Sequence, residues 1–565
     1  MGARLLGIGA WTVAAICLVP ILATVLAALA GELGTWRGLV GSVLPGYAVN
    51  TLVLALSVAF GSVVVGTGAA WLVTGYRFPG ARLLEVLMVM PLAFPAYVLA
   101  YAYTDLLSHS GAVQTALRGA TGWGPRDYWF PNIRSLPGAA VMLVCVLYPY
   151  VYLLARTAFA RQSIAAFHVA RTLGQGPWRA FFRVSLPMAR PAIAGGAVLA
   201  VMETIADYGT VAHFSVRTFS TGIYQAWFSM GDRGAAAQLA LCLLGFALVL
   251  VVLERLQRGS ARADTRGAAA QAFEPQPLPS LAGWLATAFC AVPFLIGFVI
   301  PVLVLGRMAA RSNQSLLDPR YIGFMTNSLS LAGIAALVTV AGAILVGYRA
   351  RLAPGRRARA MVMLAGIGYA VPGGVIAVGL LVPAGLLDNR IDAALRAHLG
   401  VSSGLLLTGS ISLIVVAYMV RYMATALNAF DAGLETIGRN LDAVARTLGH
   451  TPATVLGRVH LPILRGSLLT GLLLVFVDVM KELPATMILR PFNFDTLAVQ
   501  AHRLASDERL DQAAVPSLVI AAIGLLPVVL ICRGIARRGT RSAAGGQGGG
   551  AGEMPAPPPG LPAGG

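Results

Sequence analysis

The feature that most limits how this chain can fold is its succession of apolar runs, most of them about twenty residues or longer. A run of that length, coiled as an α-helix, crosses roughly 30 Å of bilayer hydrocarbon. Only 12% of the residues are charged, whereas a soluble protein carries about twice that fraction. We therefore predict an all-α membrane protein with about 12 transmembrane helices in two sets of six: 5–30, 51–73, 84–107, 137–159, 191–214 and 235–253, then 282–306, 327–348, 360–387, 404–420, 466–489 and 513–531.

A polar segment separates the two sets. Residues 254–279, rich in Arg, Ala, Gln and Pro, follow the sixth run, and a Gly-, Pro- and Ala-rich tail follows the twelfth. A tail of that composition buries too little apolar surface to fold. The predicted organisation is a first six-span repeat over 1–255, a cytoplasmic linker over 256–280, a second six-span repeat over 281–536 and a disordered cytoplasmic tail over 537–565.

The net charge of +19 arises from 42 basic residues that gather in alternate loops. Cytoplasmic loops of membrane proteins are enriched in Arg and Lys. The main clusters therefore place both termini in the cytoplasm; they lie at 156–190, in the linker, at 349–359, at 421–465 and at 533–541. We expect a multi-pass protein of the bacterial cytoplasmic (inner) membrane, with membrane lipid as the partner of its basic loops and no nucleic-acid partner.

The two sets of spans are repeats of one another. The motif VARTLG occurs at 169–174 and again at 444–449, an offset of 275 residues. Because each unit has an even number of spans, both units run the same way through the membrane, related by a pseudo-two-fold axis along its normal. Such halves enclose a pathway between them. The same offset relates further residue pairs: Glu203 with Asp478, Asp207 with Glu482, and Pro187 with Pro462.

The repeated motif lies in the longest predicted cytoplasmic loops, between spans four and five and between spans ten and eleven. Residues 442–448 have the pattern of a short amphipathic helix, and Gly449 suits the left-handed turn that ends one. A second short helix then leads to a Leu-Pro pair at which the next span begins. We expect a helix–Gly–helix knob on each half that docks its apolar face into a groove of a soluble partner.

These loops resemble the signature of the membrane subunits of binding-protein-dependent ABC importers, written E-A-A-x-x-x-G-x9-I-x-L-P. Where that family usually has the first Glu, this chain has His168 and Ala443, with Asp442 able to substitute in part. The remaining signature residues stand at the family's spacing in both copies: Gly174, Val184, Leu186 and Pro187, then Gly449, Val459, Leu461 and Pro462.

The resemblance implies two fused six-span type I permease units. It also implies two copies of an ABC ATPase subunit on the cytoplasmic side and a substrate-binding protein on the outer side. It assigns contact with the ATPases to twelve residues: His168, Ala170, Arg171, Gly174, Leu186, Pro187, Asp442, Ala445, Arg446, Gly449, Leu461 and Pro462.

The lysine content indicates that energy for transport comes from other polypeptides. A phosphate-binding G-x-x-x-x-G-K-[ST] loop requires a Lys, and the single lysine of the chain, Lys481, stands in the sequence MKEL. We therefore expect a transport subunit that is not an enzyme and binds no cofactor. ATP and Mg²⁺ are then used by the partner ATPase subunits.

Acidic residues stand inside the fifth and eleventh predicted spans. The two carboxylates of each span are four residues apart, which predicts one helix face for each pair, and Lys481 can pair with Asp478. Charges are costly in lipid, so they should face the bundle interior or an aqueous cavity. Attraction of a cationic substrate and a structural role as a helix pair or hinge both stay open. The candidate substrate-pathway residues are Glu203, Asp207, Tyr208, Asp478, Lys481 and Glu482.

Two stretches carry a narrower resemblance, to two-repeat permeases for ferric iron: ETIADYGTVAHFSVRTFSTGIYQAW and DVMKELPATMILRPFNFDTLAVQA. This resemblance implies a system of a ferric-binding protein, this permease and an ATPase homodimer. The chemistry alone indicates that oxygen ligands along the path suit a hard cation. Permeases for thiamine, sulfate or polyamine share the loop motif and remain alternatives.

A secondary transporter driven by an ion gradient is the alternative from another class. Such transporters usually carry a G-x-x-x-D-R-x-G-R loop between spans two and three, where this chain reads GYRFPGAR without an Asp. The seven histidines have no metal-ligand spacing and the five cysteines stand apart in apolar runs. We therefore expect no metal site, disulfide or catalytic centre in this chain.

Overall fold

The computed structural model describes residues 2–161, 176–261, 275–312, 314–315 and 318–545. Eleven of its helices are long and apolar enough to span a membrane, and a twelfth span results if one sharply bent pair of helices is counted as a single span. The prediction of an all-α membrane protein with about 12 spans is therefore confirmed.

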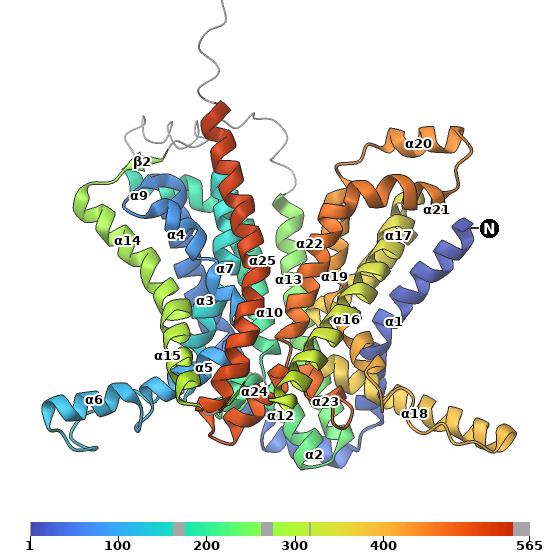
Figure 1. Ribbon diagram of the computed structural model, residues 1–565, viewed down its shortest axis with the longest axis horizontal. Helices are drawn as coiled ribbons and strands as arrows, with labels where there is room; N and C mark the ends of the chain where they lie inside the picture. Colours follow the sequence, from blue (N-terminus) through green and yellow to red (C-terminus); the bar gives the residue numbers. More distant parts are fainter. Residues whose placement is uncertain (1, 162–175, 262–274, 313, 316–317, 546–565) are drawn as a thin grey trace, which may run out of the picture.

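Figure 1 shows the elements of the first half. Short 3₁₀ and π segments, which the figure does not label, are called η. In chain order the elements are α1 (Gly2–Ala30), α2 (Leu33–Gly41), α3 (Leu44–Gly75), β1 (Tyr76–Arg77), α4 (Ala81–Leu87), η1 (Met90–Ala93), α5 (Ala96–Leu107), α6 (Ala112–Thr121), α7 (Leu136–Arg161), α9 (Pro177–Ala180), η2 (Phe181–Ser185), α10 (Leu186–Ala206), α11 (Gly209–His213), α12 (Phe219–Tyr224), η3 (Gln225–Ser229) and α13 (Arg233–Ala261).

The second half repeats this succession. Its elements are β2 (Gln276–Pro277), α14 (Ser280–Phe294), η4 (Leu295–Val299), α15 (Ile300–Arg311), α16 (Pro319–Leu352), α17 (Arg356–Gly366), η5 (Ile367–Ala370), α18 (Gly373–Leu399), α19 (Ser412–Leu434), α20 (Arg439–Thr447), α21 (Pro452–Val455), η6 (Leu456–His460), α22 (Leu461–Met480), α23 (Pro484–Leu489), α24 (Leu497–Ser506) and α25 (Leu510–Gly545). Strands β1 and β2 pair in parallel, which joins the segment before α14 to the turn after α3.

Five predicted spans differ from the structure, and two of them, the fifth and the eleventh, are broken after Ala206 and Met480. The third, 84–107, is divided, with a bend of 93° between the helices on either side of residues 94–95, because Pro91 and Pro95 interrupt the backbone hydrogen bonds of a helix. The ninth, 360–387, is divided at η5, and α18 starts after Pro372 and continues to Leu399. This longer helix displaces the tenth span from 404–420 to α19, which ends at Leu434.

The first helices of the two halves are exchanged. Helix α1 packs against α16, α17 and α18 of the second half, while α14 and α15 pack against α3, α4 and α5 of the first. The contact between α1 and α18 is close, because a Cβ atom at Gly379 would lie 2.1 Å from the carbonyl oxygen of Pro20. Small residues at such crossings are how membrane helices approach one another. Each half is therefore held by a helix of the other.

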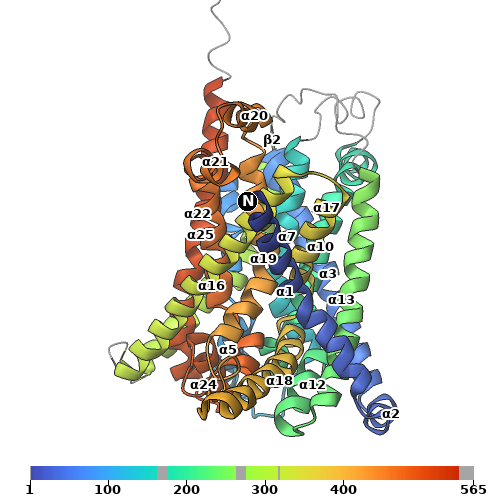
Figure 2. The same cartoon turned by 90° about the vertical axis from the view of Figure 1, so that its right-hand side faces the viewer.

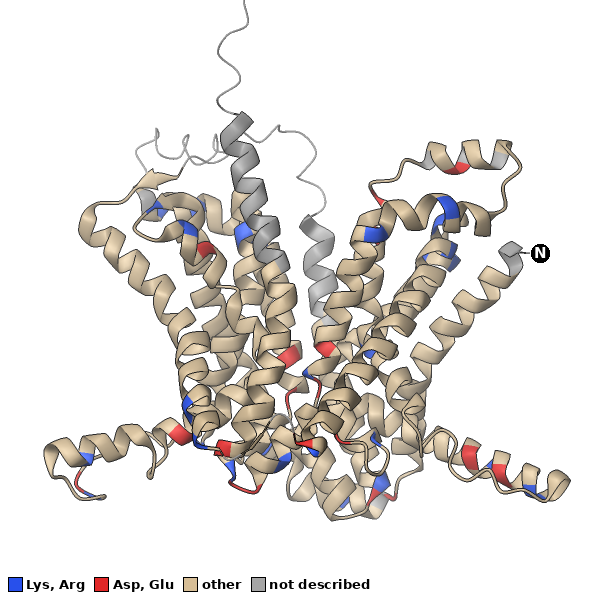
Figure 3. Cartoon of the chain, viewed as in Figure 1, with Lys and Arg blue, Asp and Glu red and all other residues tan. Residues whose placement is uncertain are grey.

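The bundle has two distinct ends. Helices α20 and α21, the start of α1 and the end of α25 lie together at one end, which we call the α20 end, and α2, α12, α23 and α24 lie at the opposite, distal end (Figures 1 and 2). The helices of the two halves diverge toward the α20 end (Figure 1). Charged residues gather toward both ends, with a few near the centre of the bundle (Figure 3).

Helix α7 packs closely between α3 and α10 because glycines face it on both sides. A Cβ atom at Gly66 would lie 2.8 Å from the backbone of Tyr148, and one at Gly196 would lie 2.6 Å from the Cα atom of Val151. Such distances leave no room for a side chain unless the helices move apart. A Cβ atom at the neighbouring Gly195 would meet only the Leu154 side chain, at 3.8 Å.

These two adjacent glycines give the first prediction. Gly196→Ala should destabilise the protein by about 1–3 kcal/mol, because it overpacks the crossing of α10 and α7. Gly195→Ala should be neutral or slightly stabilising, because its methyl group fits and Ala favours a helix over Gly by about 1 kcal/mol. Thermal unfolding of both variants in lipid nanodiscs measures the difference; equal unfolding temperatures would contradict the close approach.

Candidate functional site

A cavity of about 360 Å³ lies between the two halves. All six candidate pathway residues line it, together with a cationic side chain that the sequence did not single out, Arg421, and a group of tyrosines: Tyr97, Tyr150, Tyr369 and Tyr422. The cavity therefore combines acidic, basic and phenolic groups contributed by both repeats, as expected of a polar pathway enclosed in a membrane bundle.

The first acidic pair lies at a break in the fifth span. Helix α10 ends at Ala206, and Asp207 has an extended backbone, with φ −67° and ψ 130°. Its carboxylate accepts hydrogen bonds from the backbone N–H groups of Thr210, at 3.0 Å, and Val211, at 3.2 Å, and from the Thr210 hydroxyl at 3.0 Å. The Asp207 carboxylate therefore caps the short helix α11 from the position before its N-cap residue, Tyr208.

The second acidic pair has the same arrangement. Helix α22 ends at Met480, and the Glu482 carboxylate accepts hydrogen bonds from the N–H groups of Ala485, at 2.9 Å, and Thr486, at 3.2 Å. The hydroxyls of Thr486, at 2.9 Å, and Tyr418, at 3.3 Å, donate to it as well. Glu482 is only 5% exposed, so these bonds take the place of water around a buried carboxylate.

The prediction that each acidic pair shares one face of a continuous helix is therefore wrong. Glu203 and Asp478 lie within α10 and α22, whereas Asp207 and Glu482 lie beyond the helix ends. A short acidic side chain can satisfy the backbone N–H groups that follow it, and this competes with continuing the helix. In the second copy Pro484 adds a residue that is favoured at a helix start.

The remaining charged groups of the cavity interact with one another. The ammonium group of Lys481 lies 3.1 Å from the carboxylate of Asp478, which confirms the predicted pair. Glu203 lies within electrostatic reach of Arg421, Asp478 and Lys481. Arg421 was predicted to lie in a cytoplasmic loop because the tenth span was predicted to end at residue 420. Since α19 continues to Leu434, Arg421 instead belongs to a span and lines the cavity.

Aromatic side chains join the two halves on the distal side of the cavity. The rings of Tyr208 and Tyr224 stack with centroids 3.8 Å apart, and the Tyr224 hydroxyl donates to the carbonyl oxygen of Pro484 in the other half. The hydroxyl of Tyr101 lies 3.1 Å from Nδ1 of His502, again across the halves. These contacts join the two halves on the distal side of the cavity.

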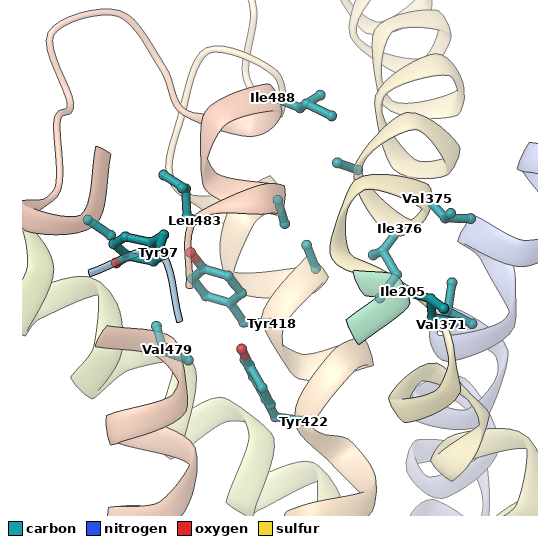
Figure 4. Packing of buried hydrophobic residues seen from close by; sticks show 14 of the residues in the cluster. Tyr97, Ile205, Val371, Val375, Ile376, Tyr418, Tyr422, Val479, Leu483 and Ile488 are labelled. Carbon is teal, nitrogen blue, oxygen red and sulfur yellow. The ribbon is translucent and has the colours of Figure 1, made fainter. Parts of the chain in front are cut away.

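Figure 4 shows the apolar packing around the second helix break. Tyr418 and Tyr422, both from α19, lie near Leu483 at the break and near Tyr97 of α5. Ile205, at the end of α10, lies beside Val371 and Ile376 of the second half. The two broken spans are thus embedded in one apolar cluster that contains residues from both repeats.

An ion pair between loops also connects the halves at the distal end. Two guanidinium nitrogens of Arg134 lie 2.7 and 2.8 Å from the carboxylate oxygens of Glu508. This pairing holds the pKa of the Glu508 carboxyl below its ordinary value. The pair is largely open to solvent, so its contribution to stability is small.

The second knob has the predicted helix–Gly–helix form. Helix α20 covers 439–447, Gly449 has the left-handed φ of +75° that was predicted, and α22 begins at Leu461 with Pro462 in its first turn. One face of α20 is turned to the bundle, with Asp442 and Ala445 buried. The adjacent face exposes an apolar stripe of three residues, Leu441, Val444 and Leu448.

Asp442 connects α20 to the bundle. Its carboxylate lies 2.7 Å from Nε of Arg351, at the end of α16, and 2.8 Å from Nε2 of His460. Arg351 also donates to the carbonyl oxygen of Leu434, at 3.1 Å. Asp442 is therefore turned toward the bundle and fastens α20 to it, while its partial substitution for the Glu of the family signature stays a prediction.

Of the first knob, Leu186 and Pro187 are described and begin α10. The other predicted contact residues of this copy, His168, Ala170, Arg171 and Gly174, lie outside the described residues. In the second copy, the side chain of Arg446 also lies outside them.

Two six-span units that exchange their first helices and enclose a charged cavity define a polytopic transport protein. The chain matches the family "Binding-protein-dependent transport system inner membrane component" twice, over residues 62–262 and 339–539. It therefore belongs to this family, as a permease of an ABC importer with two fused repeats. The predicted family, fold and multi-pass membrane placement are confirmed.

Several other proteins are similar to this chain over different shares of its length. The Fe(3+)-transport system permease protein FbpB 2 of Haemophilus influenzae is 25% identical over 491 residues, which covers 85% of this chain and 88% of that protein. A putative ferric transport system permease, FbpB 1, of the same organism is 23% identical and covers 78% and 69%. The molybdenum transport system permease ModB of Escherichia coli is 30% identical over 210 residues, which covers 36% of this chain and 86% of that protein.

Proposed function

We propose that this permease imports ferric iron. The observation that carries the proposal is the charge of the cavity, where the carboxylates of Glu203, Asp207, Asp478 and Glu482 outnumber the cationic groups of Arg421 and Lys481. A cavity of net negative charge concentrates cations, and Fe³⁺ is a hard cation that prefers oxygen ligands. The carboxylates and tyrosine hydroxyls of this cavity offer such ligands.

The relatives support the same cargo. The two named for ferric transport align with more than three quarters of this chain, including both repeats, whereas the molybdenum permease aligns with 36% of it. Molybdate and sulfate are anions, and the excess of carboxylates in the cavity would repel them. Thiamine and polyamines are cationic cargoes, and the charge of the cavity alone does not distinguish them from ferric iron.

The proposed mechanism is alternating access driven by separate ATPase subunits. We place the α20 end and both chain termini in the cytoplasm, with two copies of an ABC ATPase, one under each knob, and a binding protein at the distal end. ATP and Mg²⁺ act in those ATPases. Their closure moves the two knobs, and the halves rock about the pseudo-two-fold axis so that the distal closure opens and the cavity receives its cargo.

The experiment that tests the cargo uses the complete complex in proteoliposomes. Binding proteins loaded with ferric ion, molybdate, sulfate, thiamine or a polyamine are added in turn, and ATP hydrolysis and cargo uptake are measured. We expect the ferric-loaded protein to stimulate both. Stimulation by another loaded protein alone would replace the proposed cargo, and uptake without any ATPase would replace the mechanism with that of a secondary transporter.

Glu203 provides the second prediction, on the electrostatics of the cavity. Glu203→Gln should lower the initial rate of ferric uptake by about tenfold, equivalent to about 1.4 kcal/mol, because it removes a cavity charge that is not a helix cap. Asp127→Asn removes the same charge from an exposed distal loop and should leave the rate unchanged. Equal uptake by Glu203→Gln and the unaltered chain would show that this carboxylate does not attract the cargo.

A further inference from the structure

Each half carries a helical arm that leaves the bundle sideways at the distal end. The first arm consists of α6 and the loop up to residue 135, and the second of residues 386–411, which include the last part of α18. Figures 1 and 3 show the two arms pointing away from the bundle on opposite sides, roughly at right angles to the spans. Residue 112, at the start of α6, corresponds to residue 389 under the 277-residue offset that relates Asn50 to Asn327.

The polar side of the first arm is closed by its own loop. Arg118 donates to the hydroxyl of Tyr128, at 3.0 Å, and to the carbonyl oxygen of His109, at 2.9 Å. The Tyr128 hydroxyl in turn donates to the side-chain oxygen of Gln114, at 2.9 Å. Large apolar side chains are exposed on this arm, namely Val113, Trp123 and Trp129, of which Trp129 is 86% exposed. Polar side chains such as Arg126 and Asp127 are exposed on its loop as well.

The second arm is built on the same plan with different residues. The Asp388 carboxylate accepts hydrogen bonds from the N–H groups of Leu407 and Thr408, both at 2.9 Å, and Asp392 accepts one from Ser403, at 2.8 Å. The loop is thereby held against the polar side of α18. Large apolar side chains are exposed on this arm too, namely Leu386, Leu387, Leu399, Val401, Leu405 and Leu406, beside polar ones such as Arg390 and Arg396.

We propose that both arms lie in the membrane–water interface at the distal side and hold the permease at a fixed depth in lipid. Three observations select lipid as the occupant of these apolar faces. The arms lie level with the distal ends of the spans (Figure 1). Helix α18 runs without interruption from a first part that is buried in the bundle, residues 373–380, into its arm, so its large apolar side chains become exposed where the helix leaves the bundle. Tryptophans and exposed arginines, such as Arg390, share the surface, and this combination is typical of interfacial segments.

The arrangement also explains why each arm satisfies its polar groups internally. At the interface the side chains that face the acyl chains must be apolar, while the polar side must be hydrogen-bonded or hydrated. Helix α6 follows α5, which begins after the 93° bend in the third span. Helix α18 begins directly after the break at η5. The arms therefore anchor the two interrupted spans, one in each half, on opposite sides of the cavity.

The test measures the depth of Trp129 in the full chain, reconstituted in nanodiscs with one copy each. Fluorescence is compared between the unaltered protein and Trp129→Phe, in lipids brominated near the headgroup or deep in the acyl chain. The Trp129 component should be quenched about twofold or more by the shallow bromines, less by the deep ones, and little by aqueous iodide. In the Trp129→Phe background, Leu405→Trp should give the same pattern for the second arm.

Other occupants of the arms predict different results. Strong iodide quenching without lipid quenching would place the arms in water and overturn the proposal. The same result followed by protection when a binding protein is added would make the arms a docking surface for that protein. Protection that requires two copies in one nanodisc would make them a contact between permeases. The cargo assay under the proposed function is independent of all three outcomes.

Discussion

Val444→Asp should abolish coupled transport while leaving the permease folded. Val444 lies in the middle of the apolar stripe on α20 and is 55% exposed, with Leu441 and Leu448 on either side. If this stripe seats in a groove of an ATPase subunit, a carboxylate at its centre must be buried without a partner, at a cost of several kcal/mol. That cost corresponds to a loss of at least about a hundredfold in affinity for the ATPase at this knob.

The measurement compares three quantities: ATPase copurification, ATP-dependent cargo uptake and thermal stability of the permease. We expect the first two to fall strongly and the third to stay within about 0.5 kcal/mol, as for an exposed site. Asn440→Asp is the matched control, because it introduces a carboxylate in the same helix outside the stripe and near an N-terminus that favours negative charge. Normal ATPase binding by Val444→Asp would contradict the docking role of the stripe.

The ion pair behind α20 connects the knob to two spans of the bundle. Asp442 and Arg351 connect the helix to the end of α16, and Arg351 also holds the carbonyl groups at the end of α19. A displacement of α20 therefore moves two spans of the second half directly. The amphipathic pattern of 442–448 predicted the exposed stripe, but not this anchor, because Arg351 stands about ninety residues earlier in the chain.

The features set by local pattern were predictable from the sequence. Apolar run length indicated the number of spans, the offset of 275 residues indicated two halves, and Gly449 indicated the helix end in the knob. The features that depend on where helices begin and end were less predictable from the sequence. Arg421 was assigned to a loop because a charged residue after an apolar run usually ends a span. In the structure, the energetic cost of burying the Arg421 charge is offset by the carboxylates of the cavity, which belong to other spans.

The helix breaks left a local signal that the sequence analysis did not use. An acidic residue followed three and four residues later by the groups it caps, as Asp207 is followed by Thr210, is a recognised start of a helix. In the second copy, Pro484 follows two residues after Glu482 and strengthens that signal. The hydropathy of the sequence does not reveal the starts of α11 and α23, because the residues on either side of each break are apolar enough to form one continuous run.

Glu482→Ala should be the most damaging substitution among the cavity carboxylates. It leaves the backbone N–H groups of Ala485 and Thr486 without their acceptor in a buried position, and each such group costs about 1–3 kcal/mol. We expect a loss of about 2–6 kcal/mol in stability, partly reduced because a buried charge is removed as well. Asp207→Ala should cost less, about 1–2 kcal/mol, because Asp207 is only half-buried and its cap is more open to water.

A comparison of Glu482→Ala with Glu482→Gln separates the structural role of this carboxylate from a role in attracting cargo. The amide of Gln keeps one oxygen that can accept from Ala485 or Thr486, but carries no charge. If Glu482 acts mainly as the cap that fixes the break between α22 and α23, the Gln variant should retain most of the stability and most of the ferric uptake, while the Ala variant loses both. If uptake falls equally in the two variants while the Gln variant unfolds at the normal temperature, the charge itself serves the cargo, and the capping bonds only hold that charge at the wall of the cavity.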